Sequence, residues 1–201
     1  MTLRSQAPTI GLRVSGPWMV VPIDADDPLR AAGREAERFV ERTPELAGLR
    51  DRFVDELVVS ASECGTREVL AAAFYAAVSE TGMLIEGWLE VSASTEDWEA
   101  ATGEPTDLVA VLGAARADDT RPPEAEARAL PAGRAIRVRG ARDVQGQEAG
   151  NGFVVEYLHL WFEAPDPQRF VVVRAMTPCV GLSDQFVASV DELADTLTVE
   201  W

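Results

Sequence analysis

The stretch GFVVEYLHLWFEAPDPQRFVVVRAMT, residues 152–177, decides the fold class of this chain. Its first part, 152–164, and its last part, 169–177, consist largely of β-branched and aromatic residues, which favour strands. Pro165-Asp166-Pro167 separates the two parts, because proline lacks the N–H that a strand ladder needs and fixes its own φ. The stretch therefore predicts two strands joined by a tight turn.

A helix is expected directly after these strands. Ser183 is placed to act as its N-cap, with Leu182 and Val187 forming a hydrophobic staple across the cap. Apolar residues recur at helical spacing, and we expect this stripe to pack on the two preceding strands. The stripe comprises Leu182, Phe186, Val190, Leu193 and Leu197.

The N-terminal part of the chain predicts strands and two helices. Residues 9–23 hold two apolar runs split by Ser15-Gly16-Pro17, which indicates strand, turn and strand. Asp27-Pro28 and Thr43-Pro44 each place a capping residue before a proline, a pattern that opens helices, and Cys64-Gly65 should end the second helix. Two further strands are expected at Val69–Val78 and 83–92. The expected buried face of the first helix comprises Leu29, Ala32, Ala36, Phe39 and Val40.

The middle of the chain is more polar. Residues 106–117 suggest a short helix, and the charged segment 116–126, with its double proline, suggests a loop. Residues 127–140 suggest a hairpin that turns at Pro131-Ala132-Gly133. The polar segment 143–151 is expected to be a mobile hairpin loop.

These elements predict one domain over residues 1–201. Strands dominate, and most neighbours along the chain are joined by short turns, which favours antiparallel pairing. The expected fold class is therefore α+β: a mainly antiparallel, twisted β-sheet with helices packed on its faces, an α/β/α sandwich.

Composition excludes several classes of function. The net charge of −16 repels phosphate backbones, so nucleic-acid binding is not expected. All 18 basic residues are arginine, which excludes Schiff-base lysines and the P-loop lysine. The longest apolar run, 70–78, is too short to span a bilayer, and the N-terminus lacks the apolar region of a signal peptide. We expect a cytoplasmic protein.

Few residues are candidates for chemistry. His159 is the only histidine, so a histidine metal cluster is not possible, and we expect neither metal nor cofactor. His159 could serve as a base, although a core histidine bonded to a backbone carbonyl is the interpretation we favour. Cys64 and Cys179 are far apart in sequence and are expected to be reduced thiols. Cys64 could act as a nucleophile, but a buried structural cysteine is the simpler interpretation.

A cluster of arginines runs against the acidic composition. Arg134, Arg137, Arg139 and Arg142 lie close together in sequence and could grip a carboxylate or a phosphate. The alternative is structural: such a strand often forms ion pairs with neighbouring acids or protects a sheet edge. We favour the structural role and keep the four arginines as the candidate anion site.

The order of elements resembles a known family. A hairpin around Pro17-Trp18 and two helices precede the hairpin LPAGRAIRVRG, the aromatic strand 154–162, the strand 170–175 and Phe186-Val187-Ala188-Ser189-Val190 in a last helix. This order resembles the α/β/α sandwich of the photosystem II extrinsic-subunit (PsbP) superfamily, which also holds a Ran-binding import factor, and is similar to actinobacterial members of that group. The resemblance implies a role in binding other proteins and carries no catalytic residues over.

The sequence thus predicts a non-catalytic protein-binding or ligand-binding module. Its partner would be another protein, and an uncovered sheet edge could support a homo-oligomer. The alternative is a small-molecule enzyme that uses His159, Cys64 or a carboxylate. A deep cleft with converging polar groups would favour the enzyme, and an exposed apolar patch or open edge would favour the binding module.

Overall fold

The computed structural model describes residues 8–95, 107–144, 153–163 and 169–200. A seven-stranded antiparallel sheet organises them, in the order β2-β3-β4-β8-β7-β6-β5. A second, two-stranded sheet pairs β1 with β9. The strands are β1 (Thr9–Gly11), β2 (Trp18–Val20), β3 (Val69–Val78), β4 (Leu84–Thr95), β5 (Asp119–Leu130), β6 (Gly133–Val144), β7 (Phe153–Glu163), β8 (Arg169–Thr177) and β9 (Thr198–Glu200).

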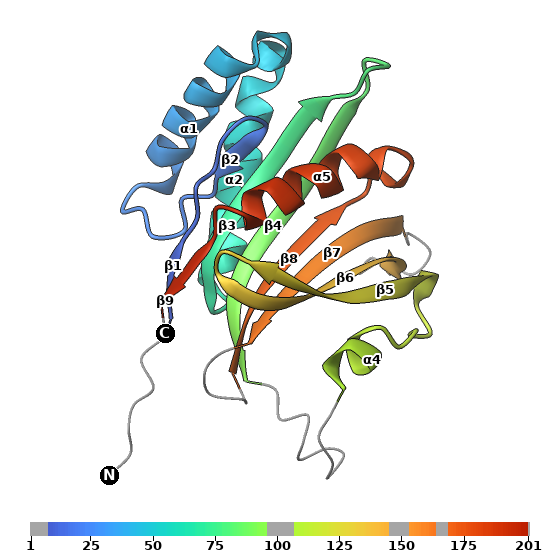
Figure 1. Cartoon of the computed structure of the whole chain (residues 1–201). Helices are drawn as coiled ribbons and strands as arrows, with labels where there is room; N and C mark the ends of the chain where they lie inside the picture. Colours follow the sequence, from blue (N-terminus) through green and yellow to red (C-terminus); the bar gives the residue numbers. More distant parts are fainter. Residues whose placement is uncertain (1–7, 96–106, 145–152, 164–168, 201) are drawn as a thin grey trace, which may run out of the picture.

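Helices cover both faces of the large sheet, which confirms the predicted α+β class (Figure 1). Helix α5 (Ser183–Ala194) crosses one face, whereas α1 (Pro28–Arg42), the 3-10 turn η1 (Pro44–Leu49) and α2 (Arg50–Gly65) pack together near β2, β3 and β4. The short helix α4 (Leu108–Leu112) packs at the other end, against β5 and β6. A 3-10 turn, η2 (Val180–Leu182), precedes α5.

The two faces hold separate apolar cores. Beneath α5, Phe186 is fully buried and packs against the rings of Trp18 and Tyr75. Gly87 lies under the same ring, where a Cβ would meet Phe186 and the Met176 carbonyl oxygen. On the opposite face, α1 and α2 bury Phe39, Phe53 and Leu57 against β3, and α4 buries Leu112 against a separate cluster on β6, β7 and β8. The predicted packing of the C-terminal helix is confirmed.

The segment 116–126 is a strand for most of its length, so the loop prediction was wrong. Residues 119–130 form β5, an edge strand that pairs with β6. Pro122 and Pro123 fall where the register shifts between Arg121 and Glu124, a place where proline is tolerated because an edge strand needs fewer ladder bonds. The predicted turn is confirmed, since Leu130 pairs with Gly133, whose φ of 131° suits glycine.

Several predicted boundaries were also wrong. Thr43 does not cap α2, because its hydroxyl donates to the Phe39 carbonyl and a 3-10 turn intervenes before α2 begins at Arg50. Ser183 is the first residue of α5, and its hydroxyl donates to the Val180 carbonyl at 3.1 Å. The helix expected over 106–117 spans only Leu108–Leu112 within the described residues, with Asp107 as its cap.

Two predictions about the N-terminal part of the chain were also wrong. The strands of segment 9–23 do not pair with each other, because β1 pairs with β9 and β2 pairs with β3. Leu29 is 63% exposed, although it begins the predicted buried face of α1. Of the expected mobile loop 143–151, Asp143 and Val144 belong to β6, and residues 145–151 lie outside the described residues.

Candidate functional site

The structure divides the four candidate arginines between the two faces of the sheet. Arg137 and Arg139 point toward α5, whereas Arg142 lies on the face of α2 and α4, where its guanidinium stacks 5.6 Å from the centre of the Tyr157 ring. Arg134 is exposed and forms no ion pair with another described residue. The four side chains therefore do not form one cluster.

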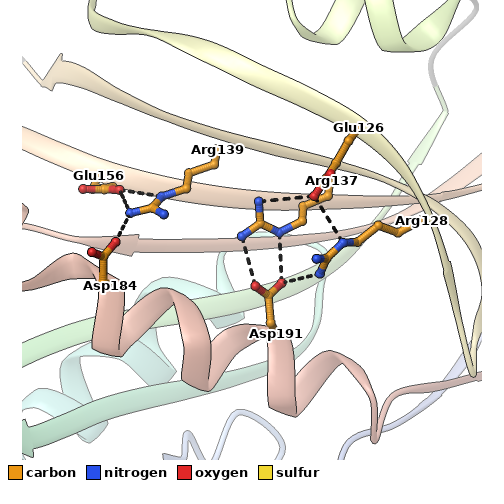
Figure 2. Close-up of polar contacts among 7 residues, drawn as sticks. All are labelled: Glu126, Arg128, Arg137, Arg139, Glu156, Asp184 and Asp191. Atoms are coloured by element: carbon orange, nitrogen blue, oxygen red, sulfur yellow. Dashed lines mark hydrogen bonds and ion pairs between the residues drawn. The ribbon is translucent and has the colours of Figure 1, made fainter.

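Arg137 and Arg139 of β6 form ion pairs with acidic residues of α5 (Figure 2). Arg137 donates from Nε and Nη2 to the two carboxylate oxygens of Asp191, at 3.0 Å each. Arg139 donates from Nε to Glu156 Oε1 at 2.8 Å and from Nη2 to Asp184 Oδ1 at 2.6 Å. Such pairing matches the structural alternative, in which the arginines neutralise neighbouring acids.

Glu156 is the buried centre of this arrangement. Its side chain is 1% exposed, and Arg121 Nη2 donates to the same Oε1 at 2.6 Å. Burial raises the pKa of Glu156, but hydrogen bonds from Arg121 and Arg139 outweigh burial and hold the pKa below its ordinary value. Glu156 is therefore an ionised structural residue, and its charge offsets those of the arginines that could have bound an anion.

The opposite face of the sheet holds two separate cavities, one beside α2 and one beneath α4. The strand register places two rows of side chains across this face. One row runs from Phe74 through Trp88 and Met176 to Tyr157. Tyr157 can lie flat across β6 because its neighbour there is Gly140, where a Cβ would meet the Tyr157 hydroxyl and ring. The other row consists of Ala72, Glu90, Arg174, His159 and Val138.

The cavity beside α2 has a volume of about 290 Å³, and we name it the α2 cavity. Its floor includes the half-buried, apolar side chains of Trp88 and Met176. Glu56 and Glu63 of α2 line its rim and form no ion pair with another described residue. Arg67 also lines the cavity, but its guanidinium donates to both oxygens of Glu90, at 2.7 and 3.0 Å. The remaining charge of the lining is therefore negative.

Cys64 lines the α2 cavity from the last turn of α2. It is buried and free, and the half-buried Cys179 is free as well. Burial raises the pKa of the Cys64 thiol, and the negative charge of Glu90 raises it further. Cys64 is thus held as a neutral thiol, which is a poor nucleophile.

His159 lines the second cavity, which is much smaller, about 20 Å³, and lies beneath α4. The residue is half-buried, but its Nε2 atom is buried and has no hydrogen-bond partner among the described residues. Burial lowers the pKa of His159 to about 3, with further contributions from the positive charges of Arg174, Arg142 and Arg116. His159 is therefore neutral at pH 7 and is a very weak base.

The sequence analysis missed the residues that form the α2 cavity. The strand MLIEGWLEV carried a usable signal, because its alternation places Glu86, Trp88 and Glu90 on one face and Ile85 and Leu89 on the other. A face that mixes acids with tryptophan does not fit a simple core. Within the described parts of the chain, no group of acidic, cysteine and histidine side chains is arranged to hold a metal ion. Among the helices of these same parts, none has the length and apolarity needed to cross a membrane.

Comparison with known proteins gives a structural likeness. No protein-family model matches the chain, and no curated protein matches its sequence. The chain is similar to the crystal structure of LpqN from Mycobacterium tuberculosis, a protein described as involved in cell envelope biogenesis. The likeness covers 99% of this chain and 88% of that one, with a TM-score of 0.47 and 12% sequence identity. It carries no argument about function, and the resemblance to the PsbP superfamily stays a prediction.

Proposed function

We propose that this protein is a non-catalytic module that binds a small organic cation in the α2 cavity. The observation that carries the proposal is the pairing of an apolar floor with an acidic rim. Trp88 and Met176 offer the floor, while Glu56 and Glu63 offer carboxylates that no described arginine neutralises. An aromatic face and a carboxylate both attract a cation, and more strongly where water is partly excluded.

The pKa shifts of His159, Cys64 and the carboxylate Glu156 support a binding role. A neutral His159 with a pKa of about 3 would be a poor general base at pH 7. The raised pKa of Cys64 opposes thiolate formation, and the lowered pKa of Glu156 opposes its use as a general acid. The cavity of about 290 Å³ has room for a single-ring amine, at the small end of the range for ligand pockets.

Calorimetric titration with matched probes tests the proposal. Phenethylamine and phenethyltrimethylammonium should bind, whereas uncharged 2-phenylethanol and anionic 3-phenylpropionate should not. Trp88→Ala and Glu63→Gln should each weaken binding at least about threefold, because each removes an attraction to the cation. Glu41→Gln, an exposed acid on α1, is the control for loss of one charge and should bind normally. Equal binding of the charged and uncharged probes would contradict the proposal.

A further inference from the structure

The small cavity beneath α4, which we name the α4 cavity, is lined by two residues that each carry a buried polar atom without a partner. The atoms are His159 Nε2 and Arg142 Nε, and neither has a hydrogen-bond partner among the described residues. An unpaired buried donor costs about 1–3 kcal/mol, so two such residues around one cavity favour a ligand that accepts from both. The cavity of about 20 Å³ has room for one particle of roughly the size of water.

The charges around the α4 cavity favour an anion. Arg142 and Arg116 line it, and Arg174 of β8 is the cross-strand neighbour of His159. All three arginines oppose protonation of the imidazole, although burial is the larger cause, and the two arginines of the lining outnumber its one carboxylate. Asp119 is the acid in the lining.

Asp119 does not neutralise Arg142, although the two residues are register partners on β5 and β6. Its Oδ2 atom accepts from the Arg116 backbone N–H at 2.6 Å, and its Oδ1 atom accepts from the Tyr157 hydroxyl at 3.4 Å. Arg142 instead contacts Met176 Sδ, at 3.7 Å from Nη2, and forms no ion pair with any described residue. A half-buried guanidinium without a carboxylate partner is an uncommon arrangement that an anion would complete.

We propose that the α4 cavity binds a small inorganic anion of about the size of chloride, held by the Nε–H groups of Arg142 and His159. The neutral imidazole would carry its proton on Nε2, so that both nitrogens donate. Sulfate and phosphate are too large for the cavity. This site is independent of the α2 cavity and of its cation.

Thermal unfolding in different sodium salts at one ionic strength tests the proposal. Chloride and bromide should raise the Tm of the wild-type protein relative to gluconate, because a ligand that binds only the folded state stabilises it. Arg142→Gln should weaken the halide affinity at least about tenfold, the loss expected for one charge-assisted hydrogen bond. Arg134→Gln, which removes an exposed arginine from the same strand, should keep the full halide response.

Asp119→Asn is a second diagnostic variant, because it removes the acid in the cavity lining and should strengthen halide binding. An identical Tm in chloride and gluconate, or an undiminished halide response in Arg142→Gln, would overturn the proposal. Should Arg142→Gln fail to fold, wild-type crystals grown in bromide decide the question. An anomalous peak between Arg142 and His159 would support a bound anion, whereas an ordinary water peak without anomalous signal would overturn it.

Discussion

Acidification from about pH 7 to about pH 5 should destabilise the protein through His159. The pKa of His159 is about 3 in the folded protein, against an unperturbed value of 6.5. The unfolded chain therefore takes up a proton in this interval while the folded protein does not. A depressed histidine pKa gives stability that is present above the unfolded pKa and is lost as the pH falls from 6.5 toward 3. Linkage over this interval gives a loss of about 2 kcal/mol, and the loss stays the same for any folded pKa well below 5.

The assay is urea denaturation at each pH, followed by tryptophan fluorescence, in gluconate buffers so that halide does not contribute. His159→Gln is the matched variant, because glutamine keeps a hydrogen-bonding group but does not titrate. Since His159 is the only histidine, the difference between the two proteins isolates its contribution from those of the many carboxylates. A wild-type loss equal to that of His159→Gln would refute the reasoning and would place the imidazole in contact with water.

Three further predictions concern the side of the sheet that α5 covers. Phe186→Ala should lower the free energy of unfolding by about 3–5 kcal/mol in chemical denaturation, because it empties a fully buried site. Gly87→Ala should lower the free energy of unfolding by about 1–3 kcal/mol, since its Cβ would meet the Phe186 ring. The double variant with Phe186→Ala should lose less stability than the sum of the two single variants. Glu156→Gln should lower the free energy of unfolding by about 1–3 kcal/mol, because it weakens the pairing of a buried carboxylate with two arginines. The control Glu126→Gln, at an exposed ion pair, should change stability by less than about 0.5 kcal/mol.

The sequence predicts elements well where one physical signal dominates. Strands β7 and β8 are apolar over almost their whole length and were located from β-branched and aromatic content. The first part of strand β5, residues 119–126, was missed because charged residues and two prolines conceal a strand whose side chains are mostly solvent-exposed. Edge strands tolerate such residues, so local composition cannot distinguish them from loops.

Pairing between distant segments limited the prediction of the candidate site. The α2 cavity needs Trp88 of β4 to lie beside Met176 of β8, and nothing in either strand specifies the other as its neighbour. The division of Arg137 and Arg142 between two faces could be predicted from the sequence. One residue number is odd and the other is even, and side chains of opposite parity point to opposite sides of a strand. Their partners could not, because Asp191 and Tyr157 come from other elements.

The pairing of β4 with β8 has a consequence for folding. Strands β3 and β4 are consecutive in the chain, and so are β5, β6, β7 and β8, so that each group can form from local turns. Only the β4–β8 contact joins the two groups, and closing so long a stretch of chain costs entropy before any contact compensates for it. Both rows of side chains, which include Trp88 beside Met176 and Glu90 beside Arg174, cross from β4 to β8. A ligand that contacts both strands would therefore meet its complete binding surface only after β4 has paired with β8, and its binding would report that the two groups of strands have joined.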